Sequence, residues 1–123
     1  MIRVEGYAAV FDAVDRAGDV VRRGAFADAA CVPLLVQHRG RAVGRIEAIG
    51  EDARGLRVVA VVAHAGVARA VASGALGGLS VGYRARSVRQ GARREILRAT
   101  LAEVSLVAVP LQPAARVERV SAV

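Results

Sequence analysis

Apolar residues recur along the chain in short runs or alternate with polar residues, a pattern that predicts a β-rich fold. Such stretches cover residues 2–11, 34–38, 42–49 and 56–63. Alternation with a period of two places successive side chains on opposite faces of a strand, whereas a continuous apolar run fits a strand buried on both faces. We therefore expect four strands here, the last two joined as a hairpin through a turn at 50–55.

The second half of the chain predicts one long hairpin. Residues 79–88 and 95–109 are strand-like and flank a polar tip, where a two-residue turn beginning at Gly91 is the simplest connection. This turn places Ser80 directly opposite Glu103, and any even shift of register keeps both side chains on one face. Because directly opposite Cβ atoms are only about 5 Å apart, an imidazole between them would need a bulge or a diagonal register.

Two further stretches predict short helices. Residues 65–73 carry apolar side chains at helical spacing and are followed by Gly74, a residue type common just after a helix end. Residues 25–31 predict a second short helix, which Pro33 ends. The helices decorate the strands and do not change the fold class.

Together these elements predict a β-rich α+β fold. We expect six or seven mostly antiparallel strands in a closed or nearly closed β-barrel with two short helices. A chain of 123 residues corresponds to one domain, and its 54% hydrophobic content can bury a core without disulfides or metal. The domain is expected to span 1–113, and the tail, 114–123, either adds an edge strand or stays loose.

The formal charge of +7 comes entirely from arginine, because the sequence contains no lysine. Such a charge favours acidic partners and keeps a domain soluble. Many of these arginines gather around the tip of the long hairpin: Arg84, Arg86, Arg89, Arg93, Arg94 and Arg98. The simplest interpretation is a solvated arm, and docking of acidic protein or phosphate is the alternative. Strands that bind nucleic acid usually add stacking aromatics, and only Tyr83 is near, so nucleic acid is not an expected partner.

The single cysteine, Cys31, excludes an internal disulfide and fits a reducing compartment. Its apolar surroundings indicate a small buried side chain rather than a reactive thiolate. The first residues include Arg3 and Glu5, so no signal peptide is expected, and no stretch reaches the roughly 18 apolar residues of a membrane span. We expect a soluble intracellular protein without a membrane partner.

Three residues in separate segments carry candidate chemistry. Ser80 lies among glycines at the start of a strand, His38 ends an apolar run, and Glu103 lies within an apolar strand. Serine, histidine and carboxylate are the residue types that form a nucleophile, a base and an orienting group. Each has a simpler explanation as a strand serine, a structural histidine, or a glutamate paired with Arg84 or Arg98. On that interpretation the chain is a catalytically silent β-barrel that acts as a scaffold or interaction module, or a basic β-barrel that binds nucleic acid.

The second histidine, His64, precedes the predicted helix at 65–73, where a structural role next to the helix start is the default. A zinc site built from His38, His64, Cys31 and a carboxylate lacks the tight ligand spacing of known zinc motifs. No glycine-rich run matches a phosphate loop or a dinucleotide fingerprint. No cofactor or metal is therefore expected.

Taken together, the segments resemble the prohead (capsid maturation) serine proteases of tailed phages, a family related in fold to the herpesvirus capsid assembly proteases. The matching stretches keep the family's order and span nearly the whole chain. They are Gly6 to Phe11, Gly18 to Val21, Gly24 to Phe26, Pro33 to Leu35 with Gln37-His38, Val43-Gly44, Gly55-Leu56, Leu79 to Tyr83, and Leu101 with Glu103 to Val107 and Pro110.

The resemblance implies that Ser80 is the nucleophile of a serine endopeptidase and His38 its general base. Glu103 falls in the family's acidic-strand motif and is our choice for the third member, with His64 as the alternative because some related viral proteases use a second histidine. The implied substrates are the major capsid protein precursor, the scaffold and the protease itself. The implied location is the immature capsid of a phage or phage-derived particle in the bacterial cytoplasm, and the resemblance leaves a homo-oligomer open.

Overall fold

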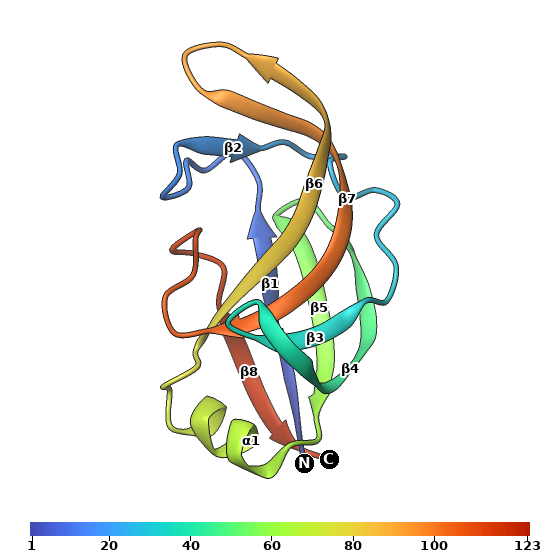
Figure 1. Cartoon of the computed structure of the whole chain (residues 1–123), viewed down its shortest axis with the longest axis vertical. Coiled ribbons are helices and arrows are strands. Elements are labelled where there is room, and N and C mark those ends of the chain that lie inside the picture. Colours follow the sequence, from blue (N-terminus) through green and yellow to red (C-terminus); the bar gives the residue numbers. More distant parts are fainter.

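The computed structural model describes all residues, 1–123, and contains eight strands and one helix (Figure 1). The strands are β1 (Ile2–Val10), β2 (Asp19–Val21), β3 (Pro33–Val36), β4 (Arg39–Glu51), β5 (Gly55–Val62), β6 (Gly78–Gln90), β7 (Arg94–Val107) and β8 (Val117–Ala122), and the helix is α1 (Ala65–Ala72). The β-rich character predicted from the hydrophobic pattern is confirmed. The termini lie together at one end beside α1, and the β6–β7 arm extends at the other end (Figure 1).

The strands form one mixed sheet in the order β2-β7-β3-β4-β5-β1-β8, with β6 paired to β7. Three pairs of successive strands, β3–β4, β4–β5 and β6–β7, form antiparallel hairpins, and β1 pairs antiparallel with both β5 and β8. Two short strands, β2 and β3, instead join β7 in parallel. The parallel β3–β7 pairing positions the candidate site, because it aligns Leu35 with Ser105 and Val36 with Leu106.

The core is one cluster of buried hydrophobic residues. It consists of aliphatic side chains from almost every strand together with two phenylalanines, Phe11 and Phe26. The largest fully buried aliphatic side chains include Leu34, Leu56, Leu79, Ile96 and Leu106. Branched aliphatic residues pack well on a pleated surface, which explains how a chain with 3% aromatic residues forms a core.

The predicted β-barrel is wrong, because the sheet is not closed. Its ends approach each other only at an isolated bridge between Gly78 and Arg116, next to the hydrogen bond from Leu79 N to Ala115 O. No ladder continues from this bridge, so β6 and β8 remain edge strands. The number of strands, eight, also exceeds the six or seven expected, since the short β2 and the C-terminal β8 both join the sheet.

The second predicted helix, at 25–31, is also wrong. The backbone around it makes successive turns with bonds such as Ala27 N to Gly24 O and Ala29 N to Phe26 O, three residues apart rather than four. The amides of Gly24 and Phe26 instead donate to the Glu51 carboxylate. This carboxylate anchors the turn while Phe26 is buried in the core, so local helix propensity is overridden.

The helix predicted at 65–73 is confirmed as α1. Its N-cap is His64, whose Nδ1 accepts from Val67 N at 3.2 Å. After the C-cap residue Ser73, the chain turns at Gly74 with φ of +87°, a conformation that favours glycine.

The β6–β7 hairpin is confirmed, but its register differs from the predicted one. The last pair, Gln90 with Arg94, leaves a three-residue loop at 91–93 in place of a two-residue turn. Irregularities farther along the arm shift the pairing again, so Ser80 pairs with Ser105 and Gly82 with Glu103. Ser80 and Glu103 still share one face, since the net shift is even.

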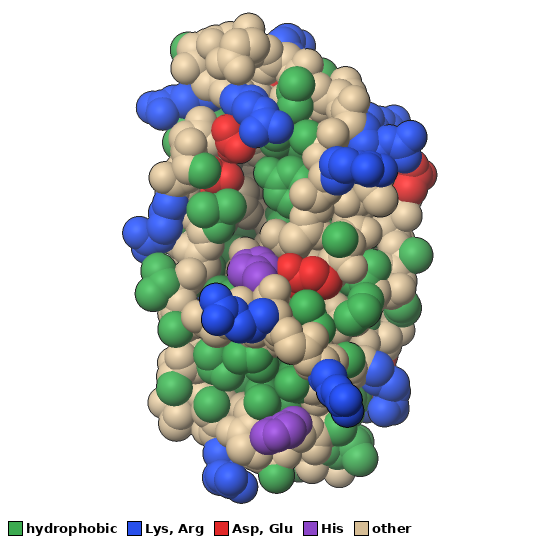
Figure 2. Space-filling view, in the orientation of Figure 1, with side chains coloured by type: hydrophobic (Ala, Val, Ile, Leu, Met, Phe, Trp, Pro, Cys, Tyr) green, Lys and Arg blue, Asp and Glu red, His purple; other side chains and the backbone are tan.

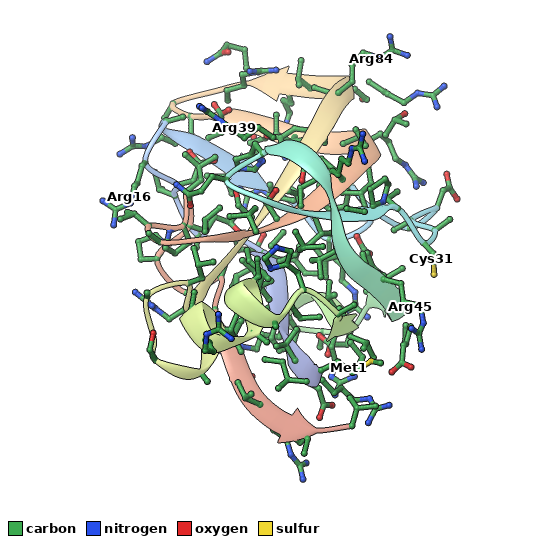
Figure 3. All side chains as sticks on the ribbon, turned by 60° about the horizontal axis from the view of Figure 1, so that its bottom comes forward. Met1, Arg16, Cys31, Arg39, Arg45 and Arg84 are labelled. Carbon is green, nitrogen blue, oxygen red and sulfur yellow. The ribbon has the colours of Figure 1, made fainter.

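Cys31 is exposed, which contradicts the predicted buried position. It lies in the 23–32 segment, on the opposite side of the molecule from Arg16 (Figure 3). The turn that replaces the predicted helix directs Ala25 and Phe26 inward and leaves Cys31 at the surface. The single helix, α1, is too short to span a membrane.

Candidate active site

A tight turn between β3 and β4 presents His38. The strands pair at Val36 and Arg39, so Gln37 and His38 are its two central residues. Both have positive φ, 53° and 62°, as in the type I′ turn that matches the twist of a hairpin. Residues with a β-carbon adopt this conformation at a cost of the order of 1 kcal/mol each, so the surrounding structure must hold the turn.

Contacts from β7 hold this turn in place. Gln37 N donates to Leu106 O, and Gln37 Oε1 accepts from Ala108 N at 2.8 Å. His38 N donates to Ser105 Oγ at 3.0 Å. The parallel β3–β7 pairing thus continues into the turn and fixes the position of the His38 backbone from which the imidazole projects.

The side chain of Glu103 contacts the His38 ring. Glu103 Oε1 lies 2.5 Å from His38 Nδ1, and Glu103 Oε2 accepts from Ser105 Oγ at 2.7 Å. Both carboxylate oxygens therefore have partners, and Ser105 links the carboxylate to the backbone of the histidine. The Glu103 side chain is 14% exposed and that of His38 is 43% exposed, so a sheltered carboxylate orients an accessible ring. Figure 2 shows a histidine beside an acidic side chain at the middle of the displayed face.

Glycine at position 82 makes this arrangement sterically possible. Gly82 pairs with Glu103 across the hairpin, and a β-carbon placed on Gly82 would overlap the carboxylate carbon and oxygen of Glu103. The carboxylate therefore lies over the bare backbone of β6. The diagonal relation between Ser80 and Glu103 also leaves the space for an imidazole that directly opposite residues would not.

Ser80 and His38 line one pocket of about 310 Å³. Ser80 is buried, at 5% exposure, and its hydroxyl makes no hydrogen bond within the chain, including none to the His38 ring. The His38 Nε2 atom is likewise without a partner in the chain. Hydrogen bonds of catalytic groups are often absent before substrate binds.

The rest of the pocket is mostly apolar, formed by Val81, Val107, Val109 and Leu111, with Arg16 as its one cationic member. Arg16 is held at the rim by two hydrogen bonds to the segment after β7, from its backbone N to Leu111 O and from Nε to Pro110 O. Nothing in the sequence singled out Arg16, because its place depends on the contact between two distant loops.

The alternative partners and site residues considered in the sequence lie apart from the candidate active site. Glu103 is paired with His38, and neither Arg84 nor Arg98 forms an ion pair with it. His64 caps α1 and lines a different hollow, with Val43 and Gly44. No group of three or more histidine, cysteine and acidic side chains is positioned to hold a metal ion.

Two residues near the site escaped the sequence analysis as contributors. Ser105 is fully buried and joins Glu103 to His38, and Gly82 provides the space for the carboxylate. Both lie within the stretches quoted for the family resemblance. The even spacing of Ser80 with Gly82 and of Glu103 with Ser105 places all four on one face, which is the signal that could have identified them.

The sequence matches the family of the Caudovirus prohead serine protease over residues 1–123, its whole length. The chain belongs to this family. The resemblance found in the sequence is therefore confirmed. No curated protein matches the sequence.

Solved herpesvirus proteases have a similar fold. The varicella-zoster virus protease is 19% identical with a TM-score of 0.65, covering 98% of this chain and 64% of that one. The protease of Kaposi's sarcoma-associated herpesvirus, in complex with a hexapeptide phosphonate inhibitor, is 14% identical with a TM-score of 0.61, covering 90% of this chain and 61% of that one. This prohead protease family member thus spans less than two thirds of either protease, and the likeness concerns the fold.

Proposed function

We propose that this chain is a serine endopeptidase that cleaves the capsid precursor and scaffold proteins, and itself, during maturation of a phage or phage-derived particle. Family membership supports a capsid maturation protease. The observation that carries the assignment of residues is the contact between Glu103 and His38 beside the pocket that His38 shares with Ser80. Its site of action is the interior of the immature capsid.

The chemistry is acyl transfer. Glu103 accepts a hydrogen bond from His38 Nδ1–H, which leaves the lone pair on Nε2 available. His38 Nε2 takes the proton of the Ser80 hydroxyl as Oγ bonds to the carbonyl carbon of the scissile peptide. The proton then passes from Nε2 to the leaving amine nitrogen as the C–N bond breaks, and an acyl-enzyme remains.

Water completes the reaction. It gives a proton to His38 Nε2 while its oxygen bonds to the acyl carbon. As the ester bond breaks, the proton returns from Nε2 to Ser80 Oγ, and the acyl group leaves as a carboxylic acid. The imidazolium that forms in each half is stabilised by the Glu103 carboxylate. A structurally similar herpesvirus protease binds a hexapeptide phosphonate inhibitor, which supports an extended peptide as the class of substrate.

Covalent labelling tests the nucleophile. A fluorophosphonate probe should attach to the chain once, and peptide mass mapping should locate it on Ser80. Ser80→Ala should lose the label and lower turnover of the capsid precursor by about 10⁶, whereas the matched change Ser121→Ala should keep both. Labelling that persists in Ser80→Ala would overturn the assignment.

A double-mutant comparison tests whether His38 works with Ser80. His38→Ala should be about as damaging as Ser80→Ala, and the double variant scarcely worse, because residues that act as one unit lose activity non-additively. Independent losses that multiply would show that the two residues do not act together.

A further inference from the structure

Another hollow, apart from the catalytic pocket and the one beside His64, lies between the 23–32 segment and the β6–β7 arm. Its volume of about 540 Å³ exceeds that of the pocket beside Ser80, and the two share no lining residue. Side chains of Ala29, Val32 and Leu101 contribute to an apolar lining. The hollow is therefore a separate feature of the surface, which we call the arginine groove after the two residues described next.

Arg86 and Arg98 both line the arginine groove, and neither forms an ion pair. Arg98 Nη1 donates to Gly24 O at 3.1 Å, and Arg86 Nη1 makes a long contact of 3.4 Å with Thr100 Oγ1. Each guanidinium carries five N–H donors, so most of their hydrogen-bonding capacity is unused. Figure 2 shows arginine side chains gathered at the upper right, where this segment meets the arm.

The arm's other arginines are not equivalent. Arg89 is paired with Glu95 at 2.8 Å and Arg94 lies 3.6 Å from Asp19, so acidic residues of the chain already neutralise part of the arm. At the groove the chain supplies only Asp28, which forms no ion pair with either arginine. The groove is thus the place where apolar surface and uncompensated positive charge coincide.

We propose that the arginine groove is a docking site for an acidic peptide segment of a partner protein, separate from the catalytic pocket. Carboxylates of the segment bind Arg86 and Arg98, and small aliphatic side chains between them pack on Ala29, Val32 and Leu101. Arginine favours such contacts because its planar group binds a carboxylate with two parallel hydrogen bonds.

A peptide fits the groove better than a nucleic acid does. No aromatic side chain lines it, so bases have nothing on which to stack. Ser87 and Thr100 offer neutral hydrogen-bonding groups that suit a peptide backbone. These features favour carboxylates spaced along a partly apolar chain.

Binding is measured on the full chain carrying Ser80→Ala, so that no cleavage interferes. The probe is a short labelled peptide in which aspartate alternates with alanine and leucine, followed by fluorescence anisotropy and by amide NMR shifts. The peptide should shift resonances of the 23–32 segment and of residues 98–101. Arg86→Gln with Arg98→Gln should weaken binding about tenfold or more, because charge-assisted hydrogen bonds are lost.

Matched controls separate the groove from net charge. Arg69→Gln with Arg93→Gln also removes two exposed arginines that form no ion pair, but neither lines the groove, so binding should stay within about twofold. Arg98 tethers Gly24, so its loss could loosen the turn. Ala30→Glu, an exposed groove position, tests the same site by repulsion without that risk and should also weaken binding.

Three results would overturn the proposal. One is equal weakening by the control pair, which would indicate general attraction. Another is unchanged binding when every aspartate of the peptide is replaced by asparagine. The third is tighter, salt-dependent binding of a single-stranded oligonucleotide that the groove changes abolish. When Ser80 is intact, all groove variants should hydrolyse a small peptide at the same rate. The docking proposal can therefore fail while the proposed catalytic function still holds.

Discussion

The carboxylate of Glu103 lies against Gly82, on the opposite strand of the hairpin, in space that a β-carbon would occupy. The glycine therefore works at a distance from the chemistry, by allowing the carboxylate to reach His38. A residue of any other type would displace Glu103 and with it the ring that Glu103 orients.

Gly82→Ala should therefore impair catalysis while keeping the fold. A misplacement of about 1 Å at a catalytic group costs on the order of 10² in rate, and we expect a loss of that size in turnover. The matched control is Gly50→Ala in β4, where a β-carbon meets nothing and φ is not positive. Kinetics and thermal unfolding of both variants check this, and equal activity of the two would contradict it.

Glu103→Gln should lower turnover by up to about 10⁴ while leaving the thermal transition nearly unchanged. An amide can donate to Nδ1 and so favours the tautomer that protonates Nε2, the wrong nitrogen for a base. Glu118→Gln, which removes an exposed carboxylate paired with Arg54, is the control and should be silent in turnover. If Glu103→Gln and wild type had comparable turnover, Glu103 would have no role in catalysis.

His64→Ala tests the alternative third member. Because His64 Nδ1 caps α1, its loss should lower the free energy of unfolding by about 1 kcal/mol, as for other N-caps, without changing turnover below the transition. His64→Asn should restore the cap and the stability, since asparagine is a preferred N-cap. A fall in turnover that His64→Asn does not rescue would favour a Ser-His-His site.

The acidic residue of the arm predicts a pH dependence of stability. Hydrogen bonds from Arg89, and then from Arg22, lower the pKa of Glu95 from 4.5 to about 2 in the folded chain. A depressed folded pKa contributes stability that is complete above the unfolded value and is lost as pH falls through the folded one. The melting temperature of wild type should thus exceed that of Glu95→Gln above about pH 4.5, and the gap should close towards pH 2. A gap that stays constant over this range would contradict the assignment.

The sequence could predict which residues share a face but not which residues are partners. Parity along β6 and β7 places Ser80 and Glu103 on one face only when the loop and the irregularities together shift the register by an even number of residues. The pairing itself depends on the three-residue loop and on the irregularity between Gly82 and Tyr83, which no local pattern reveals. The exposed position of Cys31 and the missing helix at 25–31 have a similar origin, because both depend on a contact of that segment with Glu51, far along the chain.

The closure of the barrel failed as a prediction for a different reason. Counting strands indicates how much sheet exists, whereas closure depends on whether the two edges of the sheet, here β6 and β8, meet along a ladder. Here the ends meet at one bridge only, between Gly78 and Arg116. The sequence could not predict that β2 and β3 pair in parallel with β7, because a short strand carries no signal for the direction of a distant partner strand.

The parallel pairing of β3 with β7 also affects the order in which parts of the protein fold. Leu34 lies beside Val104, a partner from the far end of the chain, and this contact must form before His38 and Glu103 can meet. Pairings between such distant segments form late, because the entropy of closing the loop is lost before the contact stabilises anything. The hairpins around it can form earlier from local contacts. A chain that has regained most of its strands therefore still lacks the candidate active site. During refolding, the recovery of activity should lag behind the recovery of the circular dichroism signal.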